Sequence, residues 1–162
     1  TCRFGLMLVA EPPRVAHEVE RVLKKGGKFG FTVWAASEKT GPVWTIRQVM
    51  ADLVPADLLP PMPDTHQWGD TKRIGELMDE CELAVRKIEP VSADWTYPSA
   101  REYWERMTKG SPMGRMLSRL PAGSTPKIET ETIQRMASLA RPDGSLSLGA
   151  EALAVVAQKG MT

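Results

Sequence analysis

The stretch CRFGLMLVAEPPRVAHEVERVLKKGGKFGFTVW, residues 2–34, decides the fold. It predicts the tail of a strand, a short loop, a helix, a glycine turn and a second strand. Pro12 and Pro13 suit the first turn of a helix, where backbone N–H groups lack intrahelical partners. The segment Lys28–Trp34 is dense in β-forming residues and predicts a buried strand. Four apolar residues at helical spacing predict the apolar face of this helix: Val15, Val19, Val22 and Leu23.

The end of this helix has its own signals. Lys24 and Lys25 are expected in the last turn, where cations oppose the negative end of the helix dipole. Gly26 and Gly27 follow and can supply the left-handed backbone that closes a helix. A glycine pair in this place follows a helix and precedes a strand, so it does not predict an anion-binding loop, which follows a strand and opens a helix.

These residues resemble the class I S-adenosylmethionine-dependent methyltransferases, and most of all the branch with the ubiquinone and menaquinone C-methyltransferases. Two segments carry the resemblance: Arg3-Phe4-Gly5-Leu6, and RVLKKGGK at residues 21–28. In the family they follow strand 4 and lead into strand 5. Lys25 stands where the family usually has proline. The resemblance implies an α/β fold, the C-terminal half of a doubly wound Rossmann-like sheet.

The order of the later elements agrees with this family. A helix is expected from Gly41 to Val54, and another is capped by Asp70. An edge strand is expected over residues 85–91 and a last strand over residues 145–158. In the family these two strands are strands 6 and 7, and strand 7 is inserted antiparallel, which gives the order 4-5-7-6. The apolar run of residues 153–157 predicts burial on both faces.

Between the last two strands the sequence predicts a helical insertion. Three short helices are expected between Trp95 and Arg141, and Ser99 with Glu102 forms a capping box at the first. We expect these helices to form a cap that selects the substrate. The domain organisation predicted is therefore a methyltransferase half-domain, residues 1–94 and 142–162, with a helical cap over residues 95–141.

The composition restricts the function. The 162 residues carry a formal net charge of +1, which offers no electrostatic footprint for nucleic acid or an anionic membrane. No apolar run reaches membrane-spanning length. Cys2 and Cys81 lie far apart and lack metal-ligand spacing, so no metal is expected. These features predict a cytoplasmic protein whose partner is a small-molecule substrate or another protein.

The resemblance implies S-adenosylmethionine as cofactor, with Cys2, Arg3 and Phe4 as the residues near its methionine part. Related enzymes usually have a small polar residue at the position of Arg3. The family's G-x-G-x-G loop and its ribose-binding acidic residue do not occur in this sequence. We therefore expect methyl transfer to a small, apolar molecule as part of a longer chain, which a start at Thr1 in place of Met would fit. The alternatives are a non-enzymatic half-domain that forms a homo-oligomer, or an inactive fragment.

Methyl transfer requires alignment of the reacting atoms more than a conspicuous catalytic motif. His66, in the loop DTHQW at residues 64–68, is the candidate general base, with Asp64 or Asp70 as alternative partners. The aromatic and methionine side chains predict a pocket for an apolar or aromatic acceptor. Their helical spacing is more typical of core packing, which is the alternative account. The candidates for substrate binding are Trp34, Trp44, Tyr103, Trp104 and Met107.

Overall fold

The computed structural model describes residues 1–61 and 64–161, with the backbone alone for residues 42 and 43. The chain groups into two compact units. Unit 1 holds Thr1–Thr40, Pro63–Ser92 and Glu151–Thr162, and unit 2 holds Gly41–Met62 and Ala93–Ala150. The long strands β3 (Leu83–Tyr97) and β4 (Leu146–Lys159) contribute residues to both units.

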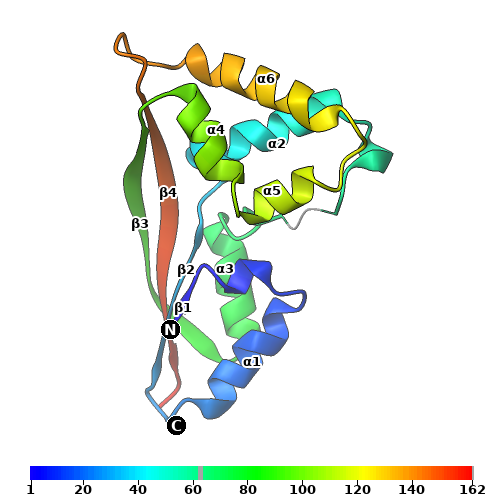
Figure 1. Ribbon diagram of the computed structural model, residues 1–162. Coiled ribbons are helices and arrows are strands. Elements are labelled where there is room, and N and C mark those ends of the chain that lie inside the picture. Colours follow the sequence, from blue (N-terminus) through cyan, green and yellow to red (C-terminus); the bar gives the residue numbers. More distant parts are fainter. Residues whose placement is uncertain (62–63, 162) are drawn as a thin grey trace. The chain divides into compact units, whose positions relative to one another are not determined.

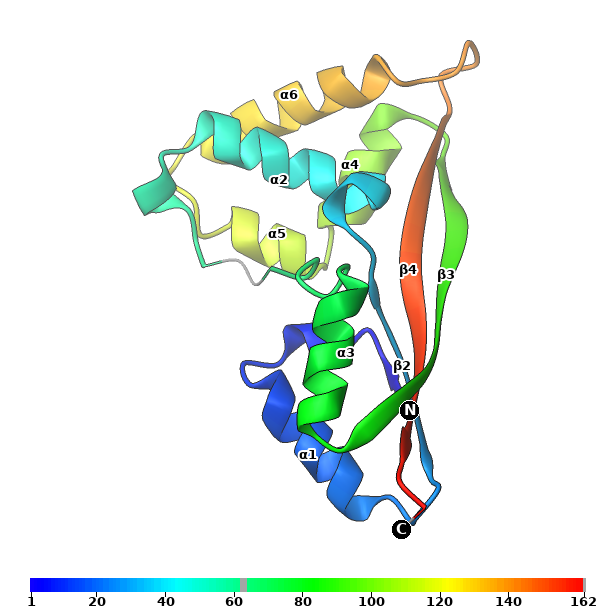
Figure 2. The same cartoon turned by 180° about the vertical axis from the view of Figure 1, so that it is seen from behind.

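Unit 1 contains the sheet and two covering helices. Its other strands are β1 (Cys2–Arg3) and β2 (Lys28–Trp34), joined through a short 3-10 turn, η1 (Leu6–Leu8), and helix α1 (Pro12–Val22). A second helix, α3 (Thr71–Glu80), precedes β3. Both helices lie on the same side of the strands (Figures 1 and 2).

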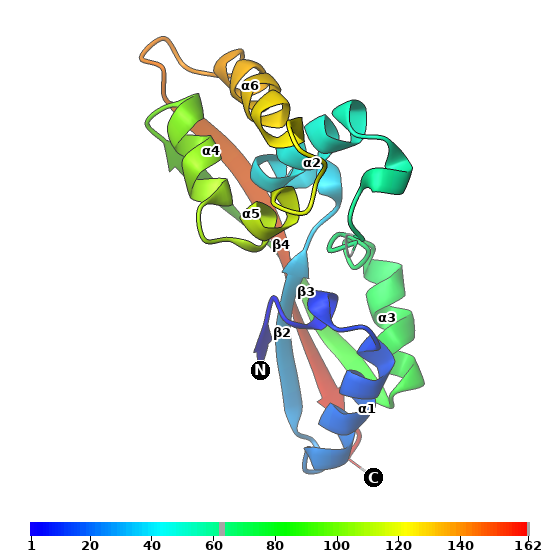
Figure 3. The ribbon, with the colours of Figure 1, turned by 45° about the vertical axis from the view of Figure 1, so that its right-hand side comes forward.

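The strand order confirms the predicted topology. The sheet runs β1-β2-β4-β3. Strand β1 is parallel to β2, with Cys2 opposite Phe31, and Figure 3 shows it beside that strand. Strand β4 is antiparallel to β2, from Lys28 opposite Gln158 to Trp34 opposite Ala152. This is the expected 4-5-7-6 order with an antiparallel inserted strand.

The core of unit 1 lies between the sheet and its two helices. Alternate residues of β2 and β4 are buried: Phe29, Phe31, Val33, Leu153, Val155 and Ala157. Helix α3 buries Ile74, Leu77 and Met78, and the adjoining Cys81 is buried as well. The intervening strand residues Ala154 and Val156 are only half-buried. Burial of β4 on both faces is therefore wrong for this unit, because α1 and α3 cover one face.

Two boundaries in unit 1 differ from the prediction. Helix α1 ends at Val22, and Leu23 is already extended, so Lys24 and Lys25 lie beyond the helix. Val22 is exposed and Ala16 takes the buried position instead. Strand β3 is longer than residues 85–91, since Trp, Thr and Tyr at its end favour extended backbone.

Unit 2 is helical. It contains α2 (Gly41–Leu53), α4 (Ala100–Thr108), α5 (Pro112–Leu117) and α6 (Ser124–Ala137), with the short turn η3 (Ala56–Leu58). Helix α2 packs along α6 and belongs to this unit. The predicted cap over residues 95–141 stays a prediction, and it omits α2.

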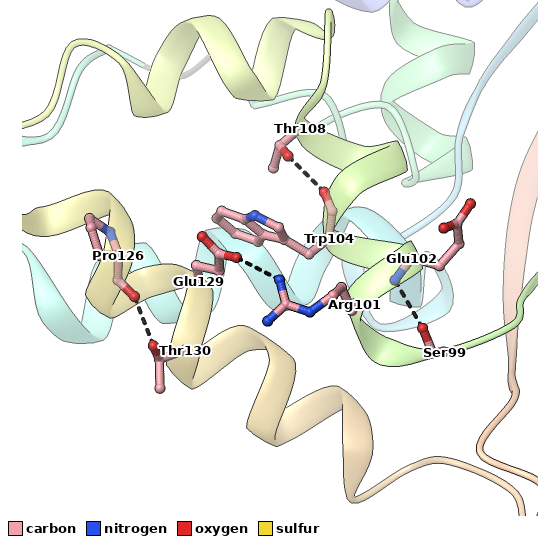
Figure 4. Close-up of polar contacts among 8 residues, drawn as sticks. All are labelled: Ser99, Arg101, Glu102, Trp104, Thr108, Pro126, Glu129 and Thr130. Atoms are coloured by element: carbon pink, nitrogen blue, oxygen red, sulfur yellow. Dashed lines mark hydrogen bonds and ion pairs between the residues drawn. The ribbon is translucent and has the colours of Figure 1, made fainter.

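Local caps and ion pairs hold these helices. The Ser99 hydroxyl accepts the Glu102 N–H at 3.1 Å, as the capping box predicts (Figure 4). Arg101 of α4 pairs with Glu129 of α6 at 3.3 Å in the same view. The core of unit 2 includes Ile46, Met50, Ile128, Met136 and Leu146. Leu139, just beyond α6, is exposed, whereas Thr132 within the helix is fully buried.

Candidate functional site

The carboxyl ends of β1 and β2 form a strained aromatic corner. Phe4, directly after β1, has φ = 54°, a left-handed conformation that is rare for a residue with a side chain. Its N–H donates to the Thr32 carbonyl at 3.1 Å and approaches the Thr32 hydroxyl at 3.2 Å. Its ring packs against Trp34, with centroids 4.5 Å apart. Backbone strain that is held in this way is typical of functional sites.

The three predicted cofactor residues meet at this corner. Cys2 is half-buried against the core, while Arg3 is exposed and lies opposite Thr32. The parallel pairing of β1 with β2 brings these residues and Phe4 to the edge where Trp34 ends its strand. Carboxyl ends of parallel strands form the ligand crevice of open α/β sheets.

A cleft lies beside the end of β2. It has a volume of about 530 Å³, within the usual range for small-molecule sites. Its polar feature is the ion pair between Lys39 Nζ and Glu151 Oε1, at 2.8 Å. The residues that line it are Ala35, Ala36, Lys39, Gly69, Thr71, Ile88, Pro90, Glu151 and Leu153.

The loop of residues 64–70 forms part of this cleft because of Gly69. A Cβ atom on Gly69 would lie 2.3 Å from the Ala36 nitrogen and 2.6 Å from the Ala35 carbonyl carbon. Only glycine permits such a close approach to backbone atoms. The neighbouring Trp68 is buried, and the Arg73 guanidinium lies 5.1 Å from its ring centroid.

His66 in the same loop contacts the end of a turn that follows β2. After β2 comes the 3-10 turn η2 (Ser37–Lys39), and then Thr40, which is 2% exposed. Thr40 Oγ lies 2.6 Å from His66 Nε2. Asp64 accepts the His66 backbone N–H at 3.0 Å, and Asp70 accepts the Lys72 N–H at 2.9 Å as the predicted cap of α3. Both candidate carboxylate partners thus serve backbone groups.

The remaining substrate candidates belong to unit 2. Tyr103 and Trp104 are buried in its core, Met107 is partly buried there, and Trp44 is half-buried. Burial raises the pKa of the Tyr103 hydroxyl far above its ordinary value. Met107 accepts a hydrogen bond from the Tyr97 hydroxyl at 3.5 Å. Their role in substrate binding stays a prediction.

Sequence reasoning missed Thr40, Gly69 and the Lys39–Glu151 pair. Gly69 carries a weak signal, a glycine beside a helix-capping aspartate. Thr40 carries no local sequence signal. Neither does the ion pair, because Lys39 and Glu151 lie 112 positions apart in the chain. Among residues 1–61 and 64–161, no cluster of three or more His, Cys, Asp or Glu side chains could hold a metal ion. Within the same residues, no helix combines the length and apolarity needed to cross a membrane.

Comparisons with known proteins bear on the fold. No protein-family model and no curated protein matches the sequence. Among the solved structures that match, two have a TM-score of 0.53 each: BH2331 from Bacillus halodurans, provisionally named a methyltransferase, at 15% identity, and the YcgJ protein from Bacillus subtilis, at 20% identity. Each match covers 98% of this chain and 62% of the other. The chain therefore has an α/β fold similar to that of these two proteins and spans less than two thirds of their length.

Proposed function

We propose that residues 1–162 form part of an S-adenosylmethionine-dependent methyltransferase that modifies a small, apolar molecule. The observation that carries this proposal is the strained Phe4–Trp34 corner at the carboxyl ends of two parallel strands, in a fold similar to that of BH2331. We expect the protein in the cytoplasm, where reducing conditions keep Cys2 and Cys81 as thiols.

The corner fits one part of the cofactor. A sulfonium is a cation, and aromatic faces such as those of Phe4 and Trp34 attract ligand cations. The backbone around Arg3 and Phe4 is the further candidate for contact with the methionine part. The glycine loop and the ribose-binding acid have no counterpart in the sequence, and our proposal assigns the rest of the site to residues outside these 162.

The cleft beside β2 supports an apolar acceptor. Ala35, Ile88, Pro90 and Leu153 give it apolar walls, which exclude water from a bound acceptor. Trp34 directly precedes Ala35, so cleft and aromatic corner adjoin along the chain. In the helical unit, the proposed candidates for binding an acceptor are Trp44, Tyr103, Trp104 and Met107.

The chemistry asked of the chain is positioning and one proton transfer. S-adenosylmethionine, when bound, supplies a methyl group on a positively charged sulfur. The acceptor's electron pair forms the new bond to the methyl carbon, and the electrons of the broken carbon–sulfur bond remain on sulfur. His66 accepts the proton that the acceptor atom loses. The aromatic corner and the cleft hold the two reactants in line.

Calorimetry tests this function. The natural chain that contains these residues is titrated with S-adenosylmethionine, and one molecule is expected to bind per chain. Phe4→Ala removes the contact with Trp34 and should weaken binding about tenfold, or roughly 1.4 kcal/mol. Leu8→Ala, at an exposed position of the same loop, is the control and should bind as the wild type does. The proposal is wrong if no cofactor binds, or if both variants bind equally.

The competing function is a non-enzymatic module that pairs with a second copy. It rests on a shallow groove of about 390 Å³ on the face of the sheet opposite to α1 and α3. The groove is lined in part by Gly30, Thr32, Ala154 and Val156. This hypothesis predicts a stable oligomer of the 162-residue chain in light scattering and no binding of S-adenosylmethionine. A monomer in solution contradicts it.

A further inference from the structure

The contact between Thr40 and His66 joins a buried hydroxyl to an imidazole nitrogen. Thr40 Oγ lies 2.6 Å from His66 Nε2 and 3.1 Å from the Ser37 carbonyl oxygen. We infer that Thr40 is a positioning residue, whose hydroxyl keeps the proton of neutral His66 on Nε2 and leaves Nδ1 as the nitrogen that accepts a proton.

The inference follows from counting protons. A hydroxyl has one proton, and the Ser37 carbonyl oxygen can only accept. The Thr40 hydroxyl therefore donates to Ser37, and its oxygen accepts from the His66 Nε2–H. Ser37 O also accepts the Thr40 backbone N–H at 3.1 Å, and its two lone pairs suffice for both bonds.

The opposite assignment leaves a contact without a proton. If the Thr40 hydroxyl donated to His66, its oxygen would face the Ser37 oxygen at 3.1 Å with lone pair against lone pair. Thr40 is 2% exposed, so water cannot relieve this repulsion easily. On the other side of the ring, Thr65 Oγ lies 3.4 Å from Nδ1, where a hydroxyl proton can point toward a lone pair.

Both partners are held in place by their backbones. The His66 N–H donates to Asp64 Oδ1 at 3.0 Å, and the Gly69 N–H donates to the His66 carbonyl at 2.8 Å. Gly69 in turn packs against the backbone of Ala36, at the start of the turn that ends at Thr40. The imidazole therefore meets Thr40 in a defined orientation.

This geometry assigns a role to each side chain. A threonine that acted as nucleophile would have to be accessible and give its proton to the base. Thr40 is buried and gives its proton to Ser37, so the pair is not a nucleophile and its base. The tautomer is a property of this chain alone, while the use of Nδ1 as the base of methyl transfer rests on the proposed function.

NMR of the histidine ring tests the inference. The 162-residue chain is labelled with ¹⁵N-histidine, and long-range ¹H–¹⁵N spectra are recorded at a pH where both imidazoles are neutral. The chain has two histidines, and exposed His17 is an internal reference that His17→Gln assigns. We expect a His66 proton bound to Nε2 that exchanges with water about tenfold more slowly than that of His17, or slower still.

Two substitutions separate the hydroxyl from the shape of its side chain. Thr40→Val keeps the shape and should lose the exchange protection of Nε2–H, while Thr40→Ser keeps the oxygen and should retain it. A protected proton on Nδ1, no protected imidazole proton in the wild type, or full protection in Thr40→Val would each overturn the inference. If Thr40→Val does not fold, the wild-type and Thr40→Ser spectra decide by the same criteria.

The NMR experiment and the cofactor titration can each contradict one hypothesis without contradicting the other. A protected Nε2–H in a protein that does not bind S-adenosylmethionine leaves the Thr40 inference intact and removes the methyltransferase role. Cofactor binding without a protected Nε2–H does the reverse.

Discussion

Gly69 determines how closely the 64–70 loop approaches the end of β2. Gly69→Ala would place a methyl group 2.3 Å from the Ala36 nitrogen, which must move because it is backbone. We expect a loss of about 1–3 kcal/mol in the free energy of unfolding, measured with urea. The contact of His66 with Thr40 should loosen together with the loop.

A second glycine gives a matched control for this substitution. A Cβ atom on Gly75, inside α3, would meet no atom of the described residues within 4 Å. Gly75→Ala should therefore stabilise the chain by about 0.5–1 kcal/mol, because alanine loses less backbone entropy in a helix. Equal effects of the two substitutions would show that the close approach at Gly69 carries no energy.

Thr132 places a polar hydroxyl at a fully buried position. Its side chain is fully buried in α6, and its hydroxyl has no hydrogen-bond partner among the described residues. Thr132→Val keeps the shape and removes the buried hydroxyl, so the free energy of unfolding should rise by about 1 kcal/mol. Thermal denaturation measures it.

Thr130, two residues before it, is the control. It is exposed, and its hydroxyl donates to the Pro126 carbonyl at 2.9 Å (Figure 4). Thr130→Val should change stability by less than about 0.5 kcal/mol. A loss of stability in Thr132→Val would mean that the hydroxyl finds a partner in solution.

At the scale of elements, the two tyrosines link β3 to α4. Tyr97 ends the strand and Tyr103 lies in the helix, with their rings edge to face at 5.2 Å. Burial raises the pKa of both hydroxyls above the ordinary value of 10.0. A raised pKa in the folded state gives stability that is complete below the unfolded value and is lost as the pH rises above it.

Alkaline pH should therefore unfold the helical unit. We expect the free energy of unfolding to fall above pH 10, and tyrosinate absorbance to appear only together with unfolding. Tyr103→Phe removes the more buried of the two groups and should flatten this decline, although it also loses the hydrogen bond with Thr45. Reversible ionisation of both tyrosines at pH 10 in the folded chain would contradict the assignment.

Elements were predictable where their signals are local. The caps at Asp70 and Ser99 each accept a backbone N–H two or three residues later, so a short window of sequence contains the whole interaction. The end of α1 was not predictable in this way. Val22 continues the apolar spacing, but Lys159 from the far end of the chain reaches the carbonyl of Glu20 at 2.9 Å, close to where the helix ends.

At the scale of the whole molecule, the topology followed from the resemblance and the division into units did not. The predicted strand order rests on the resemblance that motifs within residues 3–28 carry, and the structure confirms this order. The grouping of α2 with α4 and α6 depends on contacts between distant segments, which no periodicity reports. The same holds for the site: the corner of Phe4 and Trp34 lies within the stretch that carries the resemblance, whereas Thr40 and His66 lie in loops outside that stretch.

Strand β4 contributes to both cores, so it can test whether the two units open separately. Leu146, at its start, is fully buried in the core of unit 2, while Val155 lies in the core of unit 1 and pairs with Phe31 of β2. Leu146→Ala should cost unit 2 about 2–5 kcal/mol. Hydrogen exchange followed by mass spectrometry should show faster exchange in α4 and α6.

The other half of β4 should be unaffected. Residues 152–158 are held by the ladder with β2, which Leu146 does not enter, so their exchange should match that of the wild type. Val155→Ala is the reciprocal change, and it should speed exchange in β2 and leave the helices of unit 2 as they are. Equal acceleration in both units by either substitution would show that the chain opens as one cooperative body, because the continuous strand would then transmit the loss from one core to the other.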